Sequence, residues 1–236
     1  MSVAGPRGVA RLALLVTLVG SALVVAVPSV PAPIPIPIAL VASLLLVSLA
    51  VAAGTLRVTT VVLIGMGTLC LSLSLLPAWG ATWNDGRRYQ VGLTGVRWIV
   101  TPQAAVSAAP RCNWYTGGGD RAALCRPAAG AGWRYRLMQI ALPCLVLAVA
   151  AALSVALRLV VTRTPARRLE DVALPLLLAM GLAATGALLL LRNAGAALAV
   201  LGGSELGFGG SAPIAAGAGV VLLAAGIGTN RARIRR

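Results

Sequence analysis

The sequence contains no histidine and no lysine, and its five acidic residues are Asp85, Asp120, Glu170, Asp171 and Glu205. Without histidine, the chain lacks the usual metal ligand and the usual general base near neutral pH. Without lysine, it cannot form a Schiff base or supply the lysine of a phosphate-binding loop. No acid lies within a long apolar run, whereas proton- and cation-coupled transporters usually carry one there. We therefore predict a protein that is not an enzyme, with no catalytic residues, no metal and no cofactor.

What the sequence has in excess is apolar side chains. It is 59% hydrophobic and 11% charged, whereas a soluble domain is about 45–50% apolar and about 25% charged. A water-soluble globule of 236 residues cannot bury that much apolar surface. All 20 basic residues are arginines, and the formal net charge is +15. The chain is therefore expected to be an integral membrane protein.

Long apolar runs indicate about six membrane spans. A helix needs roughly 20 apolar residues to cross the hydrocarbon core, and barrel strands are much shorter. The predicted fold class is an all-α polytopic membrane protein with a small β-containing loop between the third and fourth helices. Its predicted spans are 9–27, 36–53, 58–76, 137–157, 172–191 and 212–228.

The spans divide the chain into four parts. We expect three N-terminal helices in 1–76, an extracytoplasmic loop in 77–136, three C-terminal helices in 137–230 and a basic cytoplasmic tail in 231–236. If both termini are cytoplasmic, the inner segments hold eleven arginines and the short outer loops hold one, Arg192. This predicts a multi-pass plasma-membrane protein with both termini inside.

The first span has a second interpretation. Arg7 and Arg11 before an apolar run also resemble a cleaved signal peptide. A retained helix is favoured, because Ala32, where cleavage could occur, is followed by Pro33. The composition, with arginine as the basic residue and much Ala, Val, Leu and Gly, is typical of proteins encoded by GC-rich DNA and favours a prokaryotic source.

The segment 77–136 holds all five tryptophans and all three tyrosines. Trp79, Trp83 and Trp133 adjoin the flanking spans, as expected for an interfacial aromatic belt. Apolar and polar residues alternate over 89–93 and again over 96–100, with a break at Gly95. Such alternation predicts a small antiparallel sheet on the outer membrane face.

The four cysteines form two pairs of different expected character. Cys112 and Cys125 lie in the exported segment, where an even pair predicts a disulfide. On the chain-entropy model, this bond would stabilise the loop by roughly 3 kcal/mol. A two-thiol metal site is the alternative, but it lacks further ligands nearby. Cys70 and Cys144 lie within spans, and we expect small apolar core residues there in preference to a second disulfide.

The outer loop carries eight arginines against two aspartates, a net charge of +6. Such a surface either is solvated and contacts headgroups or docks an acidic partner or polyanion. The expected partners are membrane lipids and a protein partner or second copy, with no nucleic acid. The candidate partner-binding residues are Arg87, Arg88, Arg97, Trp98, Arg111, Trp114, Tyr115, Arg121 and Arg126.

Small residues mark a candidate packing surface in the last span. Ala215 and Gly219 form a small-xxx-small pair, which lets helix backbones approach closely in lipid. Packing within one chain is the favoured interpretation, and a homo-oligomer interface is the alternative.

The outer loop resembles the first extracellular segment of claudins and the peripheral-myelin-protein-22 group. The resemblance covers 56–229 and rests on an ordered series of residues: Trp79 or Trp83, Gly92-Leu93, Trp98, Cys112, Cys125, and Arg134 or Arg136. The chain departs from that pattern, because Thr94 stands where the family has tryptophan and two helices precede the unit. The resemblance implies a four-helix unit with an outer sheet and an adhesion, barrier or accessory-subunit role.

Three functions are therefore weighed. The favoured one is a non-catalytic scaffold or accessory subunit that docks a partner through its basic, disulfide-braced outer loop. The alternative is a small transporter or channel subunit. The third, a membrane enzyme acting on lipid-linked substrates, would need clustered acids. The only acid pair, Glu170 and Asp171, suits the start of a helix.

Overall fold

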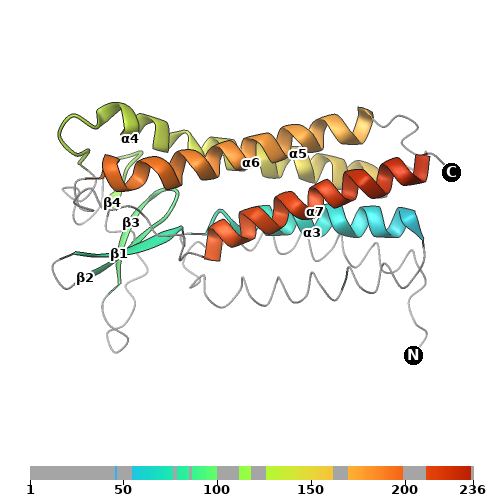
Figure 1. Ribbon diagram of the computed structural model, residues 1–236, viewed down its shortest axis with the longest axis horizontal. Coiled ribbons are helices and arrows are strands. Elements are labelled where there is room, and N and C mark those ends of the chain that lie inside the picture. Colours follow the sequence, from blue (N-terminus) through green and yellow to red (C-terminus); the bar gives the residue numbers. More distant parts are fainter. Residues whose placement is uncertain are drawn as a thin grey trace.

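The computed structural model describes residues 46, 55–76, 79–84, 87–99, 112–117, 126–161, 170–198 and 211–234. Within this part of the chain, four helices are long and apolar enough to cross a membrane. They correspond to four of the six predicted spans. The other two, over 9–27 and 36–53, lie outside the described residues except for Leu46. The described chain is thus mostly helical, with a small sheet at one end (Figure 1).

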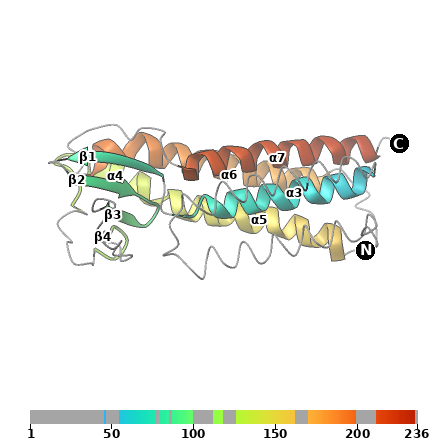
Figure 2. The ribbon, with the colours of Figure 1, turned by 90° about the horizontal axis from the view of Figure 1, so that it is seen from below.

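Five helices make up this part of the chain: α3 (Leu56–Leu73), α4 (Gly132–Gln139), α5 (Ala141–Val161), α6 (Glu170–Ala197) and α7 (Ser211–Ile234). Ile140 alone separates α4 from α5, and together they form one long candidate span. Figures 1 and 2 show the long helices running side by side. The sheet lies with α4 at one end, the sheet end. The start of α3 and the end of α7 lie at the other, the far end.

Three helices extend well beyond the boundaries predicted from sequence, and one of them is α6, which continues past residue 191 and through Arg192 to Ala197. The helix before the fourth span begins at Gly132, not at residue 137, and α7 continues to Ile234 through residues assigned to a cytoplasmic tail. Counting apolar residues locates the hydrocarbon core, but backbone hydrogen bonding continues into the polar interface. Arg231 and Arg233 are also favourable near a helix C-terminus, where cations meet the negative end of the dipole.

The closest helix packing joins α3 to α7. A Cβ built on Gly219 would lie 2.8 Å from Leu71 Cγ and 3.0 Å from the carbonyl oxygen of Gly67. A Cβ on Gly67 would lie 2.9 Å from Leu223 Cδ2. The two backbones therefore approach closely because both positions lack a side chain. Gly219 thus packs inside its own chain, and Ala215 is fully buried.

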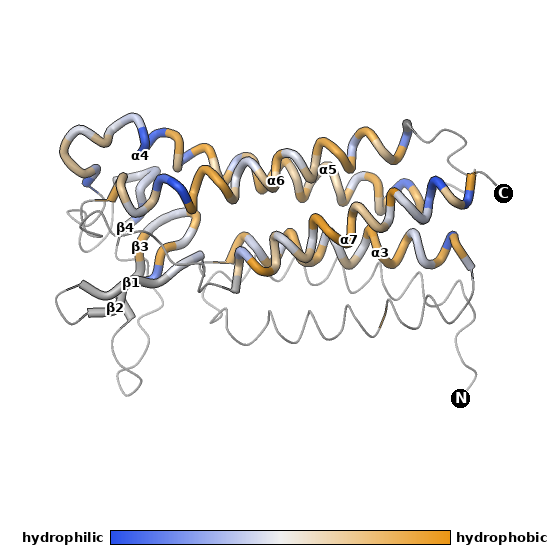
Figure 3. Tube along the Cα trace, in the orientation of Figure 1, coloured by the Kyte–Doolittle hydropathy of each residue, from blue (hydrophilic) through white to orange (hydrophobic). Residues whose placement is uncertain are grey.

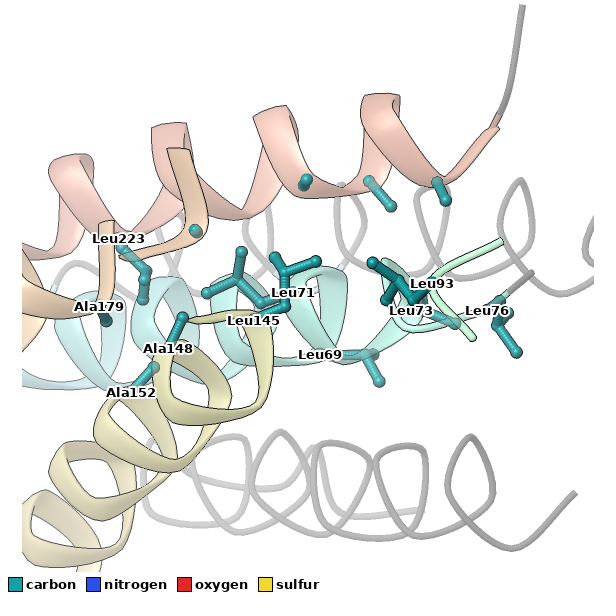
Figure 4. Close-up of a cluster of buried hydrophobic side chains, with 14 of the residues drawn as sticks. Leu69, Leu71, Leu73, Leu76, Leu93, Leu145, Ala148, Ala152, Ala179 and Leu223 are labelled. Atoms are coloured by element: carbon teal, nitrogen blue, oxygen red, sulfur yellow. The ribbon is translucent and has the colours of Figure 1, made fainter. Parts of the chain in front are cut away.

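A second close contact joins α5 to α6. A Cβ on Gly186 would lie 2.9 Å from the carbonyl oxygen of Ala141. Small residues such as Ala148 and Ala179 continue the core between these helices and α3 (Figure 4). Cys70 and Cys144 are both buried thiols, as expected for small core residues.

Helices α5, α6 and α7 are apolar over much of their length (Figure 3), and several of their large apolar side chains are exposed. Leu174, Leu188 and Val221 are each more than 60% exposed. By contrast, 89% of the α3 span is buried inside the protein. Exposed leucine and valine over several turns is the pattern expected of helix faces in lipid, with α3 inside the bundle.

The sheet has four antiparallel strands in sequence order: β1 (Gly80–Asn84), β2 (Arg87–Val91), β3 (Gly95–Ile99) and β4 (Cys112–Asn113). The predicted antiparallel pair is confirmed as β2 and β3, with Tyr89 opposite Trp98. Their turn is closed by a hydrogen bond from the Gly92 N–H to the Gly95 carbonyl at 3.0 Å. Strands β1 and β4 were not predicted, because neither sequence alternates clearly.

Candidate functional site

The candidate site is the structure at the sheet end, which we call the head: β1–β4 with residues 112–117, 126–131 and α4. Its first attachment to the bundle is Trp79. This side chain is fully buried, and its indole N–H donates to the Ser74 carbonyl at the end of α3 at 2.8 Å. Its backbone N–H donates to the Val91 carbonyl of β2 at 3.0 Å. The prediction that Trp79 belongs to an interfacial belt is therefore wrong, because the sheet folds over it.

Trp114 forms the second attachment, which lies within the head. It is 2% exposed, and its indole N–H donates to the Leu93 carbonyl at 2.7 Å. Its backbone N–H donates to the Thr94 carbonyl at 3.1 Å. Leu93 and Val96 are buried in the same hydrophobic cluster. Trp114 was predicted to contact a partner. Burial removes it from that surface and makes it part of the head's core.

A set of hydrogen bonds, the α4 clasp, holds residues 112–117 against α4. The Trp114 carbonyl accepts from the Tyr135 hydroxyl at 3.1 Å and from Gln139 Nε2 at 2.7 Å. The Tyr115 hydroxyl donates to the Gln139 carbonyl at 2.5 Å. Neither Tyr135 nor Gln139 was singled out as a site residue from the sequence. Their spacing of four, one helical turn, is the signal that could have paired them.

A third attachment joins the head to α6. The Ala128 N–H donates to the Ala197 carbonyl at 2.9 Å, and Pro127 forms a bridge with Leu198. The head is thus tied to the end of α3, to α5 through α4, and to the end of α6. Side-chain donors to backbone carbonyls satisfy groups that helix ends and turns leave open.

The remaining predicted site residues fall into three groups. Arg126 is exposed and Tyr115 is 41% exposed, so both are on the head surface. Arg87, Arg88, Arg97 and Trp98 lie in β2 and β3. Arg111, Arg121 and Cys125 lie outside the described residues, so the Cys112–Cys125 disulfide stays a prediction.

Two further basic residues on α4 complete the exposed part of the head. Arg136 is exposed, and the Arg134 guanidinium carbon lies 5.1 Å from the centroid of the Trp133 ring. That geometry is a cation–π contact. Trp133 itself is 59% exposed, and its place at the membrane interface stays a prediction. Within the described residues, no group of three His, Cys, Asp or Glu side chains could hold a metal ion.

Burial raises the pKa of the Tyr115 phenol above its ordinary value of 10.0, and desolvation is the largest cause. The folded state therefore binds this proton more tightly than the unfolded state does. Its contribution to stability is fully present below pH 10 and is lost as pH rises through the raised pKa. Burial raises the pKa of Tyr135 as well, so we expect phenolate absorbance to show late-titrating tyrosines, and Tyr115→Phe to remove the part that Tyr115 contributes. A Tyr115 midpoint at or below pH 10 would contradict the clasp.

No function can be transferred to the head from a matching protein, so its role is inferred from its own geometry. Neither family models, nor curated proteins, nor solved structures gave a match to this chain. Its chemistry is that of a fixed, basic and aromatic surface seated on four apolar helices.

Proposed function

We propose that the protein is a non-catalytic membrane scaffold or accessory subunit whose head docks an acidic protein partner. The observation that carries the proposal is the α4 clasp, because it fixes an exposed loop to the end of a membrane helix. A surface already held in its binding conformation loses less entropy when a partner binds. Such a surface suits recognition better than an unattached loop would.

The exposed part of the head has the composition expected of a docking surface. The Tyr115 ring is partly exposed next to α4, and Arg136 lies one turn before Gln139 on that helix. Arg126 is exposed on the segment that attaches to α6. Arginine and aromatic residues are enriched at protein interfaces, and a positive surface steers acidic partners toward itself.

The distribution of arginine supports an outward-facing head. Arg57, Arg158, Arg231 and Arg233 lie at the far end of the helices. Short cytoplasmic segments carry an excess of arginine and lysine, so the far end is proposed to face the cytoplasm. The head and its partner then lie on the extracytoplasmic side of the plasma membrane.

The resemblance to claudins and the peripheral-myelin-protein-22 group remains part of the proposal. It is supported by an antiparallel four-stranded sheet after the first helix of a four-helix unit, with Leu93 buried beneath the sheet and Cys112 in β4. Thr94, exposed in the turn after Leu93, still departs from the family pattern. The role implied is adhesive or accessory.

Photo-crosslinking in native membranes tests this function. A photoreactive residue at the exposed Thr116 is expected to capture one reproducible protein, identified by mass spectrometry. Arg126→Glu together with Arg136→Glu should reduce the adduct about tenfold, because two charges facing an acidic surface reverse sign. The adduct should also weaken as salt is raised.

The matched control places the same photoreactive residue at Leu177, which is 55% exposed on α6. That position is expected to yield lipid adducts but not the partner. Partner capture from Leu177 alone would mean that association occurs through the helix faces. No reproducible protein adduct from residue 116 would overturn the proposed function.

A further inference from the structure

The far end of the α3–α7 pair contains a group of polar atoms that have no described partner. The two helices run antiparallel in a regular register: Leu71 lies against Gly219, and Ile64 against Gly226. One turn further on, the Thr60 hydroxyl donates to Thr229 Oγ1 at 3.0 Å. The same register then brings the start of α3 beside the last turn of α7.

Asn230 is the clearest anomaly there. Its side chain is fully buried, yet neither Nδ2 nor Oδ1 has a hydrogen-bond partner among the described residues. It follows Thr229 and lies one turn beyond Gly226, so it is on the side of α7 that packs against α3. An unsatisfied buried amide destabilises the folded state, and such groups in native proteins usually have a partner.

Two arginines flank this amide. Arg233 is one turn after Asn230, and its Nη2 is likewise buried with no hydrogen-bond partner in the described part of the chain. Arg57 is the second residue of α3, and its charge is close enough to Arg233 for the two to repel. No carboxylate in the described part of the chain forms an ion pair with either arginine. Two neighbouring cations with no described counter-ion favour a bound anion.

The start of α3 adds further donors. Thr55, the residue at its N-cap, makes no side-chain capping bond, and no acid lies in the first turn. The first intrahelical bond is donated by Thr59, so the N–H groups of residues 56–58 have no acceptor within the helix. Open N–H groups and the positive end of the helix dipole form a ready anion site.

We propose that Arg57, Asn230, Arg233 and the first turn of α3 bind a phosphate group at the far end of the bundle. The guanidinium groups and Asn230 Nδ2 donate hydrogen bonds to phosphate oxygens. Asn230 Oδ1 accepts a hydrogen bond from a hydroxyl group of the bound phosphate compound. Arg57 is near the start of one candidate span and Arg233 near the end of another, so the site lies at headgroup depth. The phosphate is that of an anionic phospholipid or of a soluble phosphate compound.

The test uses the full chain, delipidated in neutral detergent, with phosphatidylglycerol, phosphatidylcholine or inorganic phosphate added separately. Native mass spectrometry and the thermal unfolding temperature report binding. Phosphatidylglycerol is expected to bind tightly and raise the unfolding temperature, whereas phosphatidylcholine does neither. Arg57→Gln and Arg233→Gln should each weaken binding about tenfold, as expected for loss of a charge-assisted hydrogen bond. Arg231→Gln, at an exposed position on the same turn, should leave it unchanged.

Asn230→Leu separates binding from folding. In lipid-free detergent this variant should be at least as stable as the parent, because it removes an unsatisfied buried amide, but it should lose the increment that phosphatidylglycerol gives. If inorganic phosphate binds with the same arginine dependence, the phosphate site stands and its ligand is soluble. Equal binding by Arg233→Gln and Arg231→Gln, or a full phosphatidylglycerol increment in Asn230→Leu, overturns the proposal.

Discussion

Replacing Gly219 with valine is expected to destabilise the bundle by about 3 kcal/mol, because it forces side-chain volume into the closest helix contact. A Cβ at this position would lie 2.8 Å from Leu71 Cγ and 3.0 Å from the Gly67 carbonyl oxygen. Leu71 can change its rotamer, but the Gly67 backbone cannot move without displacing α3. The two helices must therefore separate or shift along each other.

The thermal unfolding temperature in detergent, followed by far-UV circular dichroism, measures this effect. Gly217→Val is the matched control: it introduces the same β-branched residue two positions away, where a Cβ meets nothing within 4 Å. Gly217→Val should lose little stability, because it causes the same change in helix propensity as Gly219→Val but no steric clash. Equal losses in both variants would show that the α3–α7 contact does not depend on the absence of a side chain at Gly219.

Separation of the helices should also be detected directly. Thr60 and Thr229 hydrogen-bond across the same interface, about one turn beyond Gly226 in the direction of the far end. A cysteine pair placed at these two positions should cross-link readily in the parent and more slowly in Gly219→Val. The cross-linking rate of the Gly217→Val control should match the parent.

Trp114→Ala is expected to loosen the sheet from α4 and to destabilise the head by about 3–5 kcal/mol, the usual cost of truncating a buried large aromatic side chain. The ring is 2% exposed, and its indole N–H satisfies the Leu93 carbonyl. Its removal leaves a cavity between the sheet and α4 and an unpaired carbonyl. The α4 clasp, which depends on the position of the Trp114 carbonyl, should loosen with it.

Hydrogen–deuterium exchange measures this loosening region by region. Amides of residues 112–117 and of β3 should exchange faster in Trp114→Ala, whereas the middle of α3 should stay protected. Trp114→Phe should be intermediate, because it keeps an aromatic ring but leaves the Leu93 carbonyl without its donor. Trp133→Ala is the control at an exposed position. Equally fast exchange of the head in that control would refute the role given to Trp114.

Several features of the fold could be predicted from sequence because they depend on local free energies. The apolar runs locate α3, α5, α6 and α7, since transfer of a helix into lipid depends mainly on the composition of that helix. Alternation around Gly95 predicts β2 and β3, since a short turn places the two strands side by side. Burial of Cys70 and Cys144 follows from their place within apolar runs.

The candidate site could be predicted only in part. The aromatic and basic segment was identified, but the roles of its tryptophans were not. Trp79 and Trp133 both adjoin a span, yet one is fully buried and the other is 59% exposed. What distinguishes them is whether the sheet folds over the residue, and that depends on strand pairing, which a window around either tryptophan does not contain.

What the sequence by itself determined is therefore the membrane class, the four described spans and the central pair of strands, because periodicity and composition act over a few turns. Only the tertiary structure decided which small residues pack against each other between helices, and which polar groups lack a hydrogen-bond partner among the described residues. Gly67 and Gly219 are far apart in the chain, as are Arg57 and Arg233, and each pair is brought together by the steric fit between α3 and α7. That fit depends on two surfaces at once, so neither helix alone specifies it.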